Sequence, residues 1–287
     1  MLRQRIITAL ILAPLALGAI LFLPLLGFQI AFAGIIALGA WEWANLTGLT
    51  TPPSKLIYTT LVAAICLALG VMVPVSEIWV LGELHHLHKS ILIMSGFWWS
   101  LSLALIITYP NYSAFWRTSV LWRGLFGLMT LVPAWVGVVV LRTSLFEIDP
   151  FYGASLIFYV LGIVWAADVG AYFVGVKFGR HKLRPRVSPG KTIEGLLGGV
   201  CASLAIIAFA ATHYHFEMSK MWLFILLGCI TVAVSALGDL NESMFKRCAG
   251  CKDSGNLLPG HGGILDRIDS LTAAFPIFAL GYVIWMH

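Results

Sequence analysis

The chain has 287 residues, of which 60% are hydrophobic and 11% charged, with a mean hydropathy of +0.92. Soluble domains carry roughly 25% charged and about 45–50% apolar residues, so an ordinary soluble domain is excluded. The net charge of +5 does not indicate a nucleic-acid partner, because Lys and Arg lie between the apolar runs, where they set topology and contact lipid headgroups.

The apolar runs are about 17–25 residues long, which is the length that crosses roughly 30 Å of hydrocarbon as a helix. They predict an all-α, polytopic membrane bundle of about nine transmembrane helices. The expected spans are Ile6–Leu26, Phe28–Leu46, Leu56–Val75, Ile91–Tyr109, Gly124–Leu141, Phe151–Val176, Gly195–His213, Met221–Leu240 and Leu271–Met286. The first run is too long for the apolar region of a signal peptide, so we expect a retained helix, joined to the second by little more than Gly27.

The orientation follows from the basic residues. If the N-terminus is cytoplasmic, only Lys89, Arg142 and Lys220 of the 18 Lys and Arg residues fall on the outer side. This asymmetry obeys the positive-inside rule. Residues 1–150 then form the first five helices, and residues 151–287 form the last four and carry nearly all candidate chemistry, within one integrated membrane domain.

A charged group closes the eighth span. Asp239 and Glu242 are three positions apart and share a face if the helix continues that far, and Lys246 and Arg247 follow. Two carboxylates at the membrane edge are costly unless a cation or a basic partner lies beside them. The alternative is a helix end that becomes polar as it leaves the bilayer.

A second polar and glycine-rich group precedes the last span. Its members are Lys252, Asp253, Gly260, His261, Gly262, Gly263, Asp266, Arg267 and Asp269. The glycines let backbone N–H groups approach an anion, and Asp266 and Asp269 suit a hard divalent ion such as Mg²⁺. An ordinary loop with helix-capping aspartates is the alternative, but capping explains one aspartate and not both, nor Arg267.

The loop from Lys177 to Lys191 is strongly basic. Topology and contact with anionic lipid, worth about 1 kcal/mol per basic residue, account for most of that charge. Its Gly-Lys-Thr fragment is not a P-loop, because Pro185 stands where that motif needs glycine and no strand is expected before it. Lys191 and Glu194 remain candidates for a phosphate site.

Asp168 lies inside the sixth span, where a carboxylate costs about 2.5–3.5 kcal/mol on insertion scales. We expect it to face a polar cavity or a partner, with Gly170 allowing close helix packing. A structural hydrogen-bonding role is the alternative. Glu42 in the second span is a minor candidate for the same cavity, and the Cys248–Cys251 pair lacks the two further ligands of a zinc site.

These motifs carry a family resemblance. Ser243-Met-Phe-Lys246-Arg247, then Lys252-Asp253, then Leu258-Pro-Gly-His261-Gly262-Gly263-Ile-Leu-Asp266-Arg267-Ile-Asp269 resembles the signature of phosphatidate cytidylyltransferases. The earlier segment Ser188-Pro-Gly-Lys191-Thr192-Ile-Glu194 and the surroundings of Asp168 match the family in order and spacing. The first 150 residues resemble it mainly in hydropathy.

The resemblance implies the reaction CTP + phosphatidate → CDP-diacylglycerol + pyrophosphate, with Mg²⁺ and room for a second cation, in a bacterial inner membrane with the active site facing the cytoplasm. It assigns the metal to Asp239 and Asp266, with Asp269 adjacent. We further hypothesise catalytic roles for Lys246, Arg247, Lys252, Asp253, His261 and Arg267. Substrate binding is assigned to Asp168, Ser188, Lys191, Glu194, Gly262 and Gly263.

Expected partners are CTP, phosphatidate and membrane lipid, with a homodimer left open and no nucleic acid. Another Mg²⁺-dependent enzyme that joins a lipid phosphate to a nucleotide is the nearest alternative. A membrane transporter is the alternative from a different class, although transporters often show interrupted helices in both halves, and here one half lacks such features.

Overall fold

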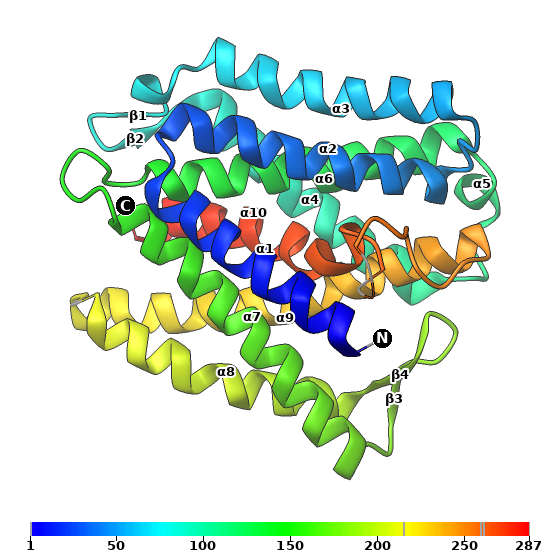
Figure 1. The fold of residues 1–287 in the computed structure, drawn as a ribbon. Helices are drawn as coiled ribbons and strands as arrows, with labels where there is room; N and C mark the ends of the chain where they lie inside the picture. The colour runs from blue at the N-terminus through cyan, green and yellow to red at the C-terminus, as the bar shows by residue number, and fades with distance from the viewer. Residues whose placement is uncertain (1, 215, 259, 261, 287) are drawn as a thin grey trace.

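The computed structural model describes residues 2–214, 216–258, 260 and 262–286, except for the side chains of residues 2–7 and 9. This part of the chain folds into ten α-helices, a short 3-10 turn and two small antiparallel hairpins (Figure 1). The helices are α1 (Leu2–Phe22), α2 (Leu25–Thr47), α3 (Pro52–Met72), α4 (His86–Thr108), α5 (Ala114–Arg117), α6 (Val120–Thr143), α7 (Tyr152–Phe178), α8 (Ile193–His213), α9 (Met218–Ala249) and α10 (Leu265–Trp285).

The strands are short. They are β1 (Trp79–Val80), β2 (Glu83–Leu84), β3 (Lys182–Arg184) and β4 (Ser188–Thr192), and the 3-10 turn is η1 (Val75–Glu77). The pair β1–β2 and the pair β3–β4 lie at opposite ends of the bundle, as Figure 1 shows. The sequence analysis did not anticipate either hairpin.

Eight helices in the described part of the chain are long and apolar enough to cross a membrane, and α1 adds a shorter apolar stretch over Leu10–Phe22. The predicted all-α, polytopic membrane fold is therefore confirmed. The predicted junction at Gly27 is wrong, because α1 ends at Phe22 and α2 begins at Leu25. Pro24 explains the position: its ring has no N–H to continue α1, while its carbonyl accepts from Phe28 N (2.8 Å) to start α2.

Helix α9 continues well past the predicted end of its span at Leu240 and stops at Gly250, whose φ of 70° lies in the left-handed region. Asp239, Glu242 and Lys246 therefore belong to one continuous helix. The condition for the first two to share a face is met.

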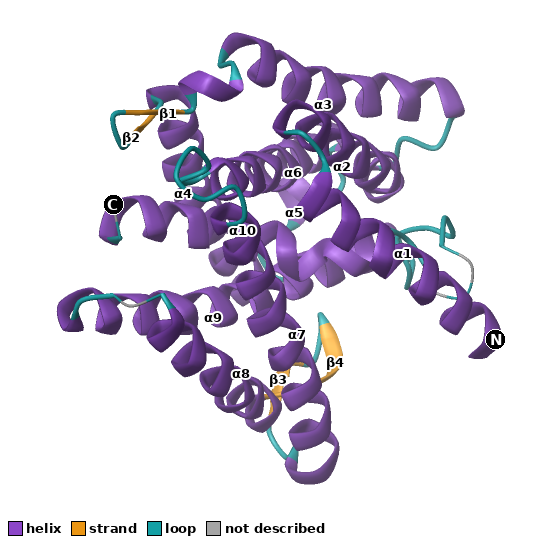
Figure 2. Cartoon of the chain, turned by 60° about the vertical axis from the view of Figure 1, so that its left-hand side comes forward, coloured by secondary structure: helices purple, strands orange, loops and turns teal. Residues whose placement is uncertain are grey.

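Helix α6 is the most buried of the candidate spans in the described chain. It lies beside α2 (Figure 2). It packs against α2, α4 and α10, and so joins the first half of the chain to the second. At Gly137 the contact is so close that a Cβ would overlap the backbone of Pro276. Gly170 likewise brings α7 onto the backbone of Gly198 in α8, which confirms the close packing predicted there.

Candidate active site

A cavity of about 650 Å³ lies between α7, α8, α9 and α10 at the end of the bundle that carries β3–β4. Segments far apart in the sequence supply its polar lining. The predicted residues that line it are Asp168, Lys191, Asp239, Asp266 and Asp269. The structure thus gathers all three predicted metal ligands and two of the predicted substrate-binding residues around one cavity.

The β3–β4 hairpin brings Lys191 to the carboxylates. Its Nζ lies 2.5 Å from Oδ2 of Asp239, and Asp168 interacts electrostatically with both groups. Thr192 ends the strand and starts α8, because its Oγ1 accepts from Gly195 N (3.1 Å) as an N-cap. Because β4 passes directly into α8, the backbone position of Lys191 is fixed relative to that helix.

Asp266 anchors the loop between α9 and α10. Its Oδ1 accepts from Lys246 Nζ (2.8 Å), and Lys246 also binds Glu242 (3.0 Å) one turn earlier in α9. Gly263 N (2.9 Å) and Ser254 N (3.1 Å) donate to Oδ2 of Asp266. The glycine-rich backbone, predicted to approach an anion, therefore approaches this carboxylate within the chain itself.

Asp269 completes the acidic group, since its carboxyl interacts with those of Asp239 and Glu242. The cluster thus sets five carboxyl groups, those of Asp168, Asp239, Glu242, Asp266 and Asp269, against the two ammonium groups of Lys191 and Lys246. Carboxylates packed without matching positive charge are unfavourable, and oxygen donors are those that Mg²⁺ prefers.

The donor chemistry of this cluster therefore fits Mg²⁺, but its present arrangement is closed. Among the described residues, no three His, Cys, Asp or Glu side chains are grouped so as to hold a metal ion. The reason is visible in the ion pairs, because Lys191 occupies an oxygen of Asp239 and Lys246 an oxygen of Asp266.

Several predicted residues lie away from the cavity lining. Glu194 accepts from the backbone N–H of Arg180 and of His181 (3.1 and 3.2 Å), and it pairs with the His181 ring (2.6 Å). It holds the start of the hairpin. Arg247 Nε donates to Val187 O (3.1 Å) and supports the hairpin tip, next to which Ser188 begins β4.

The remaining predicted residues lie on or near the α9–α10 loop. Lys252 and Asp253 are exposed on it, and Arg267 is exposed in the first turn of α10. Gly262 has a φ of +83°, a backbone conformation that residues other than glycine rarely adopt. His261 lies outside the described residues.

Two residues of α2, Glu42 and Asn45, hold the same loop, partly through Ser254. Glu42, buried in α2, accepts from Leu265 N (2.7 Å) and Ser254 Oγ (3.1 Å), and Asn45 Nδ2 donates to Ser254 O (3.2 Å). Gly255 and Gly263 pack so tightly on Glu42 that a Cβ at either would overlap its carboxyl group. Glu42 carried a signal, as an acid inside an apolar run, but nothing in the local sequence singles out Asn45 or Ser254.

The sequence model of the cytidylyltransferase family matches residues 3–285 of the chain. A phosphatidate cytidylyltransferase of Haemophilus influenzae is 41% identical over 98% of this chain and 99% of its own length. One of Pseudomonas aeruginosa is 44% identical over 97% of this chain and 96% of its own length. Matches of this extent leave no large part of the chain unaccounted for: the chain belongs to the cytidylyltransferase family.

Proposed function

We propose that this chain is a phosphatidate cytidylyltransferase, which makes CDP-diacylglycerol and pyrophosphate from CTP and phosphatidate. Family membership and the names of its near full-length relatives support the activity. The observation that carries the site is the carboxylate and lysine cavity at one end of a membrane bundle, which suits reactants that are both phosphorylated, one of them a lipid.

The obstacle to the reaction is charge. The phosphate monoester of phosphatidate is already close to a dianion near neutral pH, so it needs little activation but is repelled by the triphosphate. One of its oxygens attacks the α-phosphorus of CTP in line, the bond from that phosphorus to the bridging oxygen breaks, and pyrophosphate leaves with the bond electrons. Positive groups at the phosphate oxygens lower the repulsion and stabilise the leaving group.

Lys191 is placed to supply positive charge, since it lines the cavity and its side chain is 27% exposed. We propose that it exchanges Asp239 for a phosphate oxygen when CTP binds. Lys246 is only 11% exposed and already lies between two carboxylates, so its part is to orient Asp266. Asp239, Asp266 and Asp269 would hold Mg²⁺, which when bound neutralises charge on the triphosphate and the leaving group.

The cavity should face the cytoplasm of a bacterial cell, in its inner membrane. The positive-inside rule supports this orientation, because the cavity lies at the end of the bundle with the basic β3–β4 hairpin. CTP would then arrive from the cytosol and phosphatidate from the inner leaflet. Whether the enzyme works as a homodimer stays a prediction.

The direct test is pyrophosphate release by the purified full-length protein in lipid nanodiscs. We expect release from CTP only when phosphatidate and Mg²⁺ are both present, and its loss on adding EDTA. Asp266→Asn should reach the membrane normally and lose the activity. Lys89→Gln, an exposed cation on α4, should retain it.

Equal release without phosphatidate, or full activity of Asp266→Asn, would overturn the proposal. If another lipid phosphate replaces phosphatidate with equal or better rates, the nearest alternative enzyme holds instead.

A further inference from the structure

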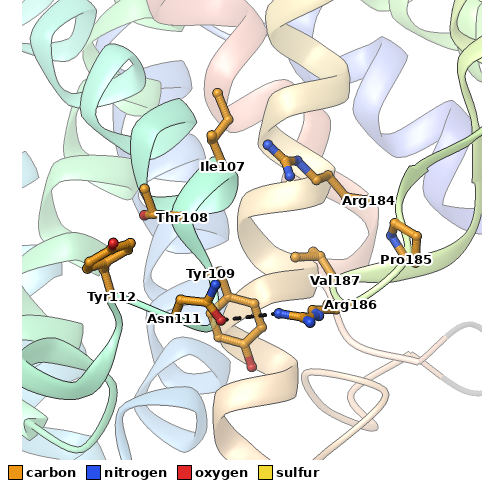
Figure 3. A pocket seen from close by; sticks show the side chains of 9 residues that line it. All are labelled: Ile107, Thr108, Tyr109, Asn111, Tyr112, Arg184, Pro185, Arg186 and Val187. Carbon is orange, nitrogen blue, oxygen red and sulfur yellow. Dashed lines mark hydrogen bonds between the residues drawn. The ribbon is translucent and has the colours of Figure 1, made fainter.

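A second cavity, of about 420 Å³, lies outside the proposed active site (Figure 3). It separates the end of α4 and the residues after it from the tip of the β3–β4 hairpin. Its lining is Ile107, Thr108, Tyr109, Asn111, Tyr112, Arg184, Pro185, Arg186 and Val187. None of these residues lines the first cavity, which the hairpin contacts through Leu183 and Gly190–Thr192 instead. The two faces of one hairpin therefore serve two cavities.

The charge of this second cavity is uncompensated. Arg184 is half-buried, and its side chain has no hydrogen bond or ion pair within the described structure, while the Arg186 side chain binds only the neutral amide oxygen of Asn111 (3.2 Å). No carboxylate belongs to the described lining. Arg117 and Arg247 lie close enough to act on Tyr109 at its edge. A half-buried guanidinium without an anion is costly, so an anionic ligand would stabilise it.

The shape of the lining indicates which anion. The two guanidinium groups offer planar, forked donors that match phosphate oxygens, and Asn111 and Tyr109 belong to the same lining. Ile107 and Val187 make another part of the wall apolar. The cavity lies at the end of α4, a helix long and apolar enough to cross a membrane. Lipid headgroups are expected at the end of such a helix, where tyrosine is also favoured.

We propose that this cavity binds the phosphate of an anionic membrane phospholipid between Arg184 and Arg186, as a site separate from the one that carries out the reaction. The same chemistry would accept free phosphate from solution. The experiment must therefore distinguish a lipid headgroup from soluble phosphate.

Binding can be measured without any turnover. The full-length protein is delipidated in detergent and incubated with phosphatidylglycerol or, separately, with phosphatidylcholine, and native mass spectrometry then counts the bound lipid. In a parallel arm, the shift in thermal unfolding is recorded with inorganic phosphate against chloride at equal ionic strength. We expect retained phosphatidylglycerol, little phosphatidylcholine and no specific shift with phosphate.

The variant Arg184→Gln/Arg186→Gln should lose phosphatidylglycerol binding by about tenfold or more, because two charge-assisted hydrogen bonds are removed. Lys182→Gln is the matched control. It removes one positive charge from the same hairpin, outside the cavity, and should bind like the wild type.

Should the double variant fold poorly, as judged by circular dichroism, Thr108→Trp tests the same cavity by filling it while keeping both arginines. If inorganic phosphate shifts the thermal unfolding of the wild type but not of the double variant, the site stands and its ligand is soluble phosphate. Unchanged lipid binding in the double variant or in Thr108→Trp would overturn the proposal, as would an equal loss in Lys182→Gln.

Discussion

In residues 1–150, several large buried side chains donate to main-chain carbonyls of other helices. Arg123 donates to Leu46 O (2.9 Å), Arg142 to Ile20 O (2.9 Å) and Trp43 to Arg123 O (2.9 Å). The ion pairs of the described chain lie instead within residues 151–287, where charged side chains bind one another, as with Lys191 and Asp239. A carbonyl satisfies a donor without creating an excess of charge, so contacts of the first kind fix helices in place.

Contacts of the second kind leave carboxylates in excess, which is a state that a cation or a phosphate-bound metal can relieve. The charged cluster therefore lies in a rigid frame that is held together by a different chemistry. Glu42 is an exception in the first half, since its carboxylate reaches across to hold the α9–α10 loop.

The largest effect is expected at the centre of the cluster. Asp239→Asn keeps the shape of the side chain and removes one charge, so we expect activity to fall by about 10²–10³-fold or more. Thermal unfolding should change little, because the carboxylate excess is itself unfavourable. Pyrophosphate release and differential scanning fluorimetry check the two parts.

The matched control is Glu83→Gln, the same chemical change at an exposed residue of β2 in the first half. It should leave the rate unchanged. A variant Asp239→Asn with more than half of the wild-type activity would show that the cluster is structural and remove the contrast between the halves.

Glu42 comes next and tests the exception. Glu42→Ala removes the acceptor for Leu265 N and Ser254 Oγ, so buried donors are left unpaired at a cost of roughly 1–3 kcal/mol. We expect a loss of about tenfold in activity, because the loop that carries Gly263 and the backbone donors to Asp266 loosens. Steady-state kinetics and chemical denaturation measure both.

If Glu42 contributed only to overall stability, its loss would not expose the α9–α10 loop more than other segments. Limited trypsin digestion should show faster cleavage after Lys252 in Glu42→Ala, with unchanged cleavage after Lys182 on the hairpin. Glu77→Ala, an exposed acid of the first half, is the control. Uniform acceleration at both sites would make Glu42 a general stability residue.

Much of the fold was predictable because membrane helices are recognised by their length and apolar composition. The position of Asp239 and Glu242 one turn apart on one helix follows from helical spacing alone. The hairpin β3–β4 was not predicted, because its strands are short and mostly polar, and Pro189 and Gly190 stand within β4. The junction at Pro24 was predicted at Gly27 instead, although proline is the stronger helix breaker.

Prediction of the site from the sequence has the same limit. The aspartates and Lys191 could be named from motifs that are local in the sequence. The bond between Ser254 and Glu42 joins positions 212 residues apart, and no local pattern encodes a contact of that range. Glu194 and Arg247 were named for substrate chemistry, yet in the structure they hold the hairpin. Local motifs thus predict which residue types gather, whereas the fold decides which of them face the cavity.

The smallest effects are expected at close helix contacts. A substitution beside the carboxylate cluster should lower both activity and stability, whereas one in the frame should lower stability alone. At Gly238 in α9 a Cβ would overlap the backbone oxygen of Asp269, so Gly238→Ala must push α10 away from α9. Overpacking of this kind costs typically about 1–3 kcal/mol. Because Asp239 and Asp269 flank this contact, we expect activity to fall several-fold in addition to stability.

Gly137→Ala overpacks α6 against Pro276 in α10, in the middle of the frame and away from the cluster. It should lower stability by a similar amount and leave the rate per folded molecule near wild type. Gly34→Ala, with open space around its Cα, should be neutral or slightly stabilising, since alanine favours helix by roughly 0.5–1 kcal/mol. Rates normalised to folded protein decide the matter: if Gly137→Ala slows turnover as much as Gly238→Ala, the frame and the cluster act as one unit.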